Sequence, residues 1–373
     1  MSNEQRKVRE PLMRIAKRTD PLPAWKAWTI RLIAFLLSLV VSGILIIMIS
    51  DLNPLDVFTE MIHGAAGTSK RLWVTIRDTM TLLCIAVGLA PAFKMRFWNI
   101  GAEGQVLVGA IASAACMIYC KNLPTVLLFL VMIVSSLLAG GLWGLLPGIF
   151  KAKWNTNETL FTLMMNYIAI QLTCFYVAKW ENPFGSNTVG IINSMGKEGW
   201  LPNLFSPGYN RDYGWNVIIV LLVTLFMYLY MNKSKHGYEI AVIGDSENTA
   251  RYAGIRVSRV YIRTIVLSGA VCGLAGFIAV SGASHTISPT TAGGRGFTAI
   301  IVAWLAHFNS FVMLLFSFLL IFLQKGAQAI ASAYNLNNEV SEIITGIILF
   351  FLLGSEFFIN YMVKFRGKKA AKK

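Results

Sequence analysis

Polar side chains that could hold a small molecule lie inside otherwise apolar stretches of this sequence. The stretch Phe97 to Ala110 carries Asn99, Glu103 and Gln105 among apolar and glycine residues. Two amides and a carboxylate offer hydrogen-bond donors and acceptors, but they do not form a nucleophile with an adjacent base. We therefore expect these side chains either to contact a polar solute or to hydrogen-bond neighbouring helices.

A second polar set lies further along the chain. Between Glu158 and Ala178, the side chains of Glu158, Thr162, Asn166 and Thr173 fall on one side of a helical wheel. Such a stripe on an apolar cylinder should face protein or water. Thr162 and Asn166 therefore join the first set as candidate residues.

The third group is a charged segment, Asn232 to Arg263, that lies between long apolar runs. Asp245 or Ser246 can cap a short helix, Glu247 sits where the helix dipole favours an anion, and Gly254 can end the helix. Small residues would let this helix seat deeply in a groove of another protein, while Arg251 and Glu247 could pair across that contact at its rim. The residues predicted to make the contact are Glu247, Ala250, Arg251, Ala253 and Gly254.

Other site chemistries lack their motifs. The five cysteines have no CxxC spacing and no two of the four histidines have ligand spacing, so we predict neither a metal site nor a disulfide framework. The sequence also lacks GxxxxGK[ST], the usual loop for cradling ATP phosphates, and we find no catalytic constellation. We expect no cofactor and no enzyme activity in this chain, so that ATP, if it is used, is bound by a partner.

Composition shows which elements must position these residues. The 373 residues are 55% hydrophobic and only 14% charged, whereas about a quarter of the residues in a soluble domain are charged. The chain is therefore predicted to be an all-α polytopic protein of the lipid bilayer. Its net charge of +15 lies in short loops and at the two ends, where orientation bias and anionic lipids explain it. Nucleic acid is not an expected partner.

About ten transmembrane helices follow from the apolar runs. The expected spans are Thr29–Ser50, Leu72–Phe93, Phe97–Tyr119, Thr125–Phe150, Glu158–Ala178, Trp215–Met231, Tyr261–Ser281, a short span Phe297–His307, Phe311–Ser332 and Val340–Tyr361. Gly101 and Gly104 make a broken or re-entrant start of the third span possible. Gly269, Gly273 and Gly276 predict close helix packing in the seventh.

The distribution of lysine and arginine predicts the topology. Basic tails at 1–27 and 362–373 flank a single transmembrane domain, 28–361, and both termini are expected in the cytosol. The charged loop 232–260 should lie on the cytosolic side, and the loop 179–214, which has few charges, on the outer side. We expect the membrane to be the bacterial plasma membrane.

A faint internal repeat relates the two halves. NIGAEGQVLVGA is followed later by Asn157, Glu158 and Thr162, and GGRGFTAIIVAWLA by Asn338, Glu339 and Thr345. The first glycine-rich opening is expected at the inner face and the second at the outer face. Inverted repeats of this kind place a transport pathway between the halves. Asn99, Glu103, Gln105, Thr162 and Asn166 are the residues predicted to line or brace it.

Four motifs carry a resemblance to a known family. They are Asn99–Gln105, Asn157-Glu158 with Thr162–Ala169, Ala250–Ile255 and Gly294–Phe297. Together they resemble the permease subunits of ABC importers for branched-chain amino acids, ribose-type sugars and nucleosides, and most of all the nucleoside-type permeases that work with a basic-membrane-protein-type lipoprotein.

The resemblance implies a permease subunit that moves a small polar solute, expected to be a nucleoside, across the plasma membrane. It also implies three partners: a separate ABC ATPase into which the helix at Glu247–Gly254 docks as a coupling helix, a second homologous permease in a heterodimer, and an extracytoplasmic solute-binding lipoprotein. Two alternatives stay open, a ribose-type sugar ABC permease and an ion-coupled secondary transporter, which also uses inverted repeats and broken helices.

Overall fold

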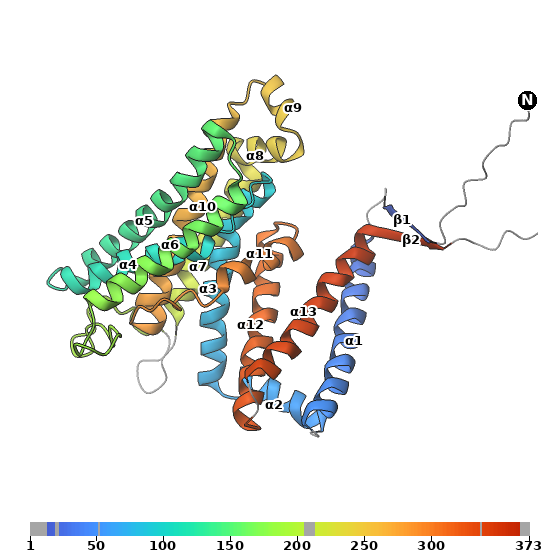
Figure 1. Cartoon of the computed structure of the whole chain (residues 1–373), viewed down its shortest axis with the longest axis horizontal. Helices are drawn as coiled ribbons and strands as arrows, with labels where there is room; N and C mark the ends of the chain where they lie inside the picture. The colour runs from blue at the N-terminus through green and yellow to red at the C-terminus, as the bar shows by residue number, and fades with distance from the viewer. Residues whose placement is uncertain (1–12, 19–21, 51–52, 205–212, 336–337, 366–373) are drawn as a thin grey trace, which may run out of the picture. The chain divides into compact units, whose positions relative to one another are not determined.

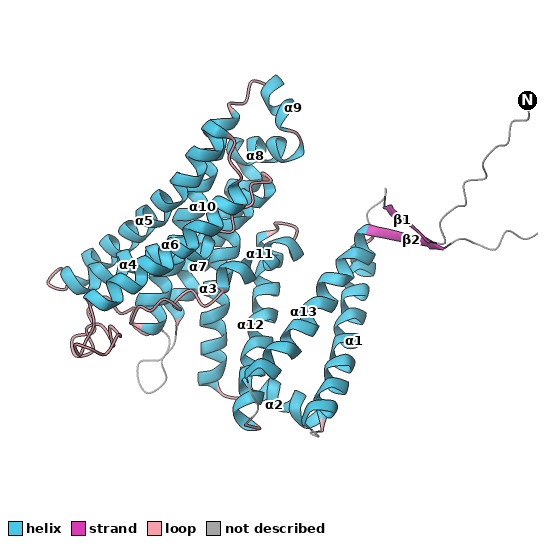
Figure 2. Cartoon of the chain, viewed as in Figure 1, coloured by secondary structure: helices cyan, strands magenta, loops and turns pink. Residues whose placement is uncertain are grey.

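The computed structural model describes residues 13–18, 22–50, 53–204, 213–335 and 338–365. The predicted basic tails, 1–27 and 362–373, and the predicted outer loop, 179–214, lie partly outside the described residues. In the described part the chain is almost entirely helical, as predicted (Figures 1 and 2). The elements are β1 (Met13–Lys17), α1 (Ala24–Ser50), α2 (Pro54–Ala66), α3 (Ser69–Lys94), α4 (Ala102–Tyr119), α5 (Thr125–Trp154), α6 (Glu158–Lys179), α7 (Gly214–Lys233), α8 (Lys235–Asp245), α9 (Glu247–Tyr252), α10 (Val257–Ala279), the π-helical turn η1 (Val280–Ser284), α11 (Arg295–Leu305), α12 (Ser310–Ala333), α13 (Asn338–Asn360) and β2 (Tyr361–Phe365).

Among the described residues, nine helices are long and apolar enough to cross a membrane. They correspond to nine of the ten expected spans. The remaining one, expected at Phe297–His307, is α11, which has eleven residues. At 1.5 Å per residue α11 is about 16 Å long, roughly half the thickness of a hydrocarbon core. As a helix, α11 by itself therefore covers only about half of the core.

Two compact units make up the fold. The larger unit, 65–322, is built around α10, which packs against α3, α4 and α5, while α6 packs on α4 (Figure 1). Glycines allow the closest of these contacts. A Cβ atom on Gly273 would collide with the Ser136 carbonyl oxygen of α5, and one on Gly269 with the Gly140 carbonyl oxygen. The packing role predicted for the glycines of α10 is confirmed.

The smaller unit contains residues 1–64 and 323–373. In it α1 packs along α13, and Arg31 forms an ion pair with Glu356 at 2.7 Å. β1 and β2 pair as an antiparallel ladder from Met13 opposite Phe365 to Lys17 opposite Tyr361. This ladder and the helix α2 are additions to the predicted fold, in which these segments were tails and an outer loop.

Non-helical backbone interrupts two elements of the larger unit. Between α3 and α4 the chain from Phe97 to Gly101 is not helical, so α4 has the broken start that its glycines had suggested. Before α11, Gly294 adopts φ +73°, a conformation that a residue with a side chain rarely adopts. The backbone N–H and C=O groups of both non-helical segments require hydrogen-bond partners, and the side chains that supply them form the candidate functional site.

Candidate functional site

Asn166 on α6 holds the non-helical segment that precedes α4. Its Oδ1 accepts the Gly104 amide hydrogen bond at 2.9 Å, and its Nδ2 donates to the Ile100 carbonyl at 2.9 Å. One turn earlier, Thr162 Oγ1 accepts from the Ile100 amide at 3.1 Å and donates to the Glu158 carbonyl at 2.7 Å. Both side chains are buried. They satisfy backbone groups that neither α3 nor α4 can pair.

Asn99 and Gln105 complete this buried amide network. Asn99 Nδ2 donates to Gln105 Oε1 and to Ser268 Oγ on α10, both at 3.3 Å, and Asn99 Oδ1 accepts from the Gly101 amide at 3.1 Å. The structure thus brings together four of the five residues predicted to line or brace a pathway. In this conformation their polar atoms are directed to protein partners, and a contact with solute stays a prediction.

Glu103, the fifth of these residues, joins the two glycine-rich motifs. Its Oε1 accepts from the Gly294 amide at 2.7 Å and its Oε2 from the Gly296 amide at 2.8 Å. Gly294 is the N-cap of α11, so the carboxylate sits where unpaired amides and the helix dipole favour an anion. Glu103, in the first turn of α4, therefore caps the N-terminus of α11, although it lies 191 residues from Gly294 in the sequence.

A charged cluster that the sequence analysis did not single out lies beside this contact. Asp78 on α3 accepts from Arg77 Nε at 2.8 Å through Oδ1, and its Oδ2 forms an ion pair with Arg295 Nη2 of α11 at 3.4 Å. Arg77 also donates to the Tyr213 hydroxyl at 3.3 Å. The sequence signal for this cluster was an adjacent Arg-Asp pair inside the apolar run Leu72–Phe93. Charged residues are rare in membrane spans, and each one indicates a candidate functional site.

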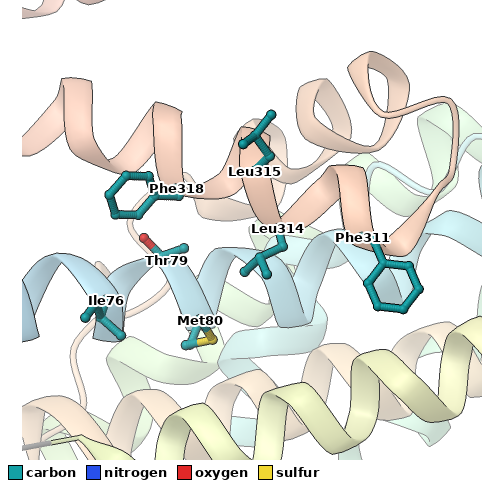
Figure 3. Close-up of a pocket in the computed structure, with 7 residues that line it drawn as sticks. All are labelled: Ile76, Thr79, Met80, Phe311, Leu314, Leu315 and Phe318. Carbon is teal, nitrogen blue, oxygen red and sulfur yellow. The ribbon is translucent and has the colours of Figure 1, made fainter. Parts of the chain in front are cut away.

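An apolar cavity lies on another face of α3 (Figure 3). Its volume is about 420 Å³, and its lining residues are Ile76, Thr79, Met80, Phe311, Leu314, Leu315 and Phe318. The single hydroxyl among them, that of Thr79, donates to the Thr75 carbonyl at 2.7 Å. Since the side chains that line the cavity direct no other hydroxyl, amide or charge into it, they offer little to orient a polar solute.

The predicted coupling helix is α9, which with α8 lies at one end of the helices of the larger unit (Figure 1). Ser246, one of the two predicted caps, accepts from the Thr249 amide at 3.2 Å, and Gly254 follows the helix with φ +76°. Arg251 and Glu247 pair with each other along the helix at 2.6 Å, and their pairing across a contact with a partner stays a prediction. The predicted cap and the glycine at the end of the helix are confirmed.

The small residues of α9 divide between two faces. Ala250 is 0% exposed and packs in an apolar cluster with Phe97, Ile243 and Val260. Ala253 and Gly254 are exposed, as is Tyr252, 92% exposed, which had not been among the candidates. Ala250 thus anchors α9 to its own chain, and the neighbouring residues form the free surface.

Contacts with α3 and α10 hold α8, which carries α9. Gly244 packs so closely on the C-terminal end of α3 that a Cβ would collide with the Lys94 carbonyl oxygen. Glu239 pairs with Arg263 of α10 at 3.0 Å, and His236 also contacts Arg263. Burial raises the pKa of Glu239, but Arg263 and His236 lower it more, so that the pKa lies below that of an ordinary glutamate. Glu239 is therefore ionised at neutral pH and ties α8 to α10.

Aromatic contacts hold a segment of the predicted outer loop. Trp200 stacks on His285, with ring centroids 3.9 Å apart, and donates through Nε1 to the Ile192 carbonyl at 2.8 Å. Asn193 donates to the Met117 carbonyl of α4 at 2.8 Å.

Among the described residues, no group of three or more His, Cys, Asp and Glu side chains could hold a metal ion.

Comparison with known proteins connects this arrangement to transport. A model of the family described as branched-chain amino acid transport system / permease component matches residues 73–353. The guanosine ABC transporter permease protein NupP of Bacillus subtilis is 30% identical over 348 residues, which are 92% of this chain and 96% of the relative.

Two further relatives match over almost their whole length. The nucleoside ABC transporter permease protein NupB of Lactococcus lactis is 27% identical over 97% of this chain and 95% of the relative. The glucose ABC transporter permease protein TsgB13 of Haloferax volcanii is 26% identical over 94% of each chain.

Proposed function

The chain belongs to the family of permease components of branched-chain amino acid transport systems, and from this membership we propose that it imports nucleosides with the help of a separate ATPase. It is an ABC transporter permease, a transport component that spans the membrane several times. The observation that carries the choice of solute is the 30% identity to a guanosine permease over 92% of the chain.

Coupling to an ATPase is assigned to the exposed surface of α9 and the turn that follows it, which consists of Tyr252, Ala253 and Gly254 together with the Glu247–Arg251 pair. Ala250 holds this surface to the membrane helices through its own buried side chain. A rigidly capped helix on a fixed base can pass a displacement of the ATPase to α8, α10 and the C-terminal end of α3. Because the chain lacks GxxxxGK[ST], ATP is bound by the partner.

The remaining parts of the assembly follow from the resemblance. A second homologous permease completes the transmembrane channel, and a solute-binding lipoprotein delivers the solute from outside. The complex lies in the plasma membrane, with both termini of this chain and α9 in the cytosol, because lysine and arginine concentrate there.

Glucose is the second candidate solute, because TsgB13 matches 94% of the chain, almost as much as the 97% that NupB matches. Uptake of labelled guanosine and glucose should be compared in cells that express the complete importer and in cells that lack only this chain. We expect guanosine uptake to fall to background without the chain and glucose uptake to be unchanged. Loss of glucose uptake with normal guanosine uptake would assign the sugar instead.

A further inference from the structure

Arg77 and Asp78 lie within the membrane-spanning part of α3, where Asp78 pairs with Arg295 of α11. Asp78 is nine residues from Ser69 and sixteen from Lys94, or about 14 Å and 24 Å from the two ends of the helix. The 26 residues of α3 exceed a 30 Å hydrocarbon core by roughly 9 Å. Even if the whole excess lay beyond the Ser69 end, Asp78 would still be about 5 Å inside the core.

Exposure distinguishes this cluster from the buried amide network. The side chain of Asp78 is 3% exposed, whereas those of Arg77 and Arg295 are 18% and 24% exposed. Charged side chains within a membrane almost always face the interior of the helix bundle or a water-filled cavity, so the exposed parts of these guanidinium groups should meet water or protein. In a permease, water at this depth belongs to the pathway of the solute.

The two arginines keep hydrogen-bonding capacity. A guanidinium group has five N–H donors. Within the described part of the chain, the side chain of Arg295 has the ion pair with Asp78 and no hydrogen bond. Arg295 is also the first residue of α11, where the helix dipole opposes a positive charge. Its charge therefore does not serve to stabilise α11.

Charge balance indicates the class of solute. Among the residues that the structure describes, Arg77 and Arg295 contribute two positive charges, and Asp78 and Glu103 contribute two negative charges that contact the same segment of α11. A neutral cluster with spare donors favours uncharged oxygen acceptors over anions. The apolar cavity on α3 lacks such donors.

We propose that Arg77 and Arg295, held in place by Asp78, form a solute-contacting site that donates hydrogen bonds to hydroxyl and carbonyl oxygens of a neutral polar solute. The site rests on the proposed import of nucleosides and names residues that contact the solute inside the permease. A ribose ring, with neighbouring hydroxyl groups, has the acceptor oxygens that such a site requires.

The test is Arg295→Gln in the complete importer, reconstituted in liposomes with the ATPase, the second permease and the receptor. Maximal uptake is measured with receptor saturated by a ribonucleoside or by its 2′,3′-dideoxy analogue. Since the receptor is the same in every assay, a change in the ratio of the two rates reports the permease. We expect the rate for the ribonucleoside divided by the rate for the dideoxy analogue to fall toward one by about tenfold or more. A change of this size is the effect of losing a hydrogen bond to a charged group.

Arg31→Gln is the matched control, because Arg31 forms a similarly buried ion pair with Glu356 in the smaller unit. It should leave the ratio unchanged. An unchanged ratio in Arg295→Gln would overturn the site. An equal loss of uptake for both solutes together with a lower melting temperature would also overturn the site, because it would show that Arg295 only stabilises the fold. Loss of the second permease on purification would overturn it as well, because it would show that Arg295 lies in the interface with that subunit.

Failure of the nucleoside proposal can be told apart from failure of this site. If the wild-type importer carries glucose and no nucleoside, the ratio is measured with glucose and a deoxyglucose. A shift of that ratio in Arg295→Gln supports the site with a different solute, whereas an unchanged ratio overturns it.

Discussion

At the residue scale, Asn166 shows how one side chain can support a break in a membrane helix. Its amide pairs with a backbone N–H and a backbone C=O of the segment before α4. Within a bilayer such groups must find partners in the protein. The amide of asparagine carries both a donor and an acceptor, so it replaces the two missing backbone bonds at once.

Asn166→Ala should therefore lower the thermal stability of the permease. It leaves two buried backbone groups without partners, which costs about 1–3 kcal/mol each by soluble-protein values and less in membranes, where single contacts average about 0.6 kcal/mol. Thr173→Ala is the control, because the Thr173 hydroxyl only donates to Ala169 one turn earlier on the same helix. The measurement is the melting temperature in detergent. A stable Asn166→Ala protein with altered solute preference would favour a role in lining the pathway.

Which residues could be predicted from sequence depended on local signals. Asn99, Glu103, Gln105 and Asn166 stood out because amides and carboxylates are unusual in apolar runs. Arg77 and Asp78 did not, because a single charged pair barely changes the hydropathy of a 26-residue helix. The partners of Glu103 lie 191 and 193 residues away. The repeat linked their two motifs, but the hydrogen bonds themselves depend on the tertiary fold.

At the element scale, the contact of α10 with α5 depends on facing glycines. Gly269 and Gly273 were visible as a close-packing pattern in α10, whereas their partner Gly140 on α5 was recognised only in the structure. Without a hydrophobic driving force between helices in lipid, close backbone approach is a principal source of association.

Gly273→Ala should weaken this contact, because the added Cβ would meet the Ser136 carbonyl and α5 would have to move away. Overpacking of this kind typically costs about 1–3 kcal/mol. Gly346→Ala in α13 is the matched control, since a Cβ there meets no described atom within 4 Å. We expect a lower melting temperature for the first variant and an equal or higher one for the second. Equal melting temperatures would contradict the packing account.

Local rules predicted α9 better than they predicted α2 or α11. A serine cap and a C-terminal glycine mark α9 in the sequence, because capping depends on neighbours in the chain. The helix α2 lay in a segment read as an outer loop, and its length is too short to signal a span. For α11 the apolar run was recognised, but its short length as a helix depends on the turn at Gly294 and the cap from Glu103.

Ala253→Trp should uncouple the importer. Ala253 is exposed beside Tyr252, so a bulky side chain can be added without disturbing the fold of this chain. It would overfill a groove of the ATPase, and we expect ATP-driven uptake to fall about tenfold or more, in line with truncation effects at interface centres. Asn232→Trp adds the same bulk at an exposed position at the end of α7. Both proteins should reach normal membrane levels. Normal transport by Ala253→Trp would show that α9 does not couple the ATPase to the permease.

At the scale of the whole molecule, the architecture explains why the chain needs partners. The described units contain membrane helices, a capped helix at one end and buried polar networks, and the sequence has no phosphate-binding loop. Among the described residues, the charges of Arg77, Asp78 and Arg295 are balanced by Glu103 of α4, whereas an ion-coupled carrier would need an ionisable group that changes charge during the cycle. Glu103 is committed to two backbone amides. The energy for uptake should therefore come from the ATPase.

The most direct test of this account is the energy source for accumulation of solute. Liposomes containing the two permeases and the ATPase are given loaded receptor outside and ATP inside, with and without ionophores that collapse proton and sodium gradients. We expect nucleoside to accumulate against its gradient only when ATP and the ATPase are present, whether or not ionophores are added. Accumulation that an ion gradient drives in the absence of the ATPase would contradict the account.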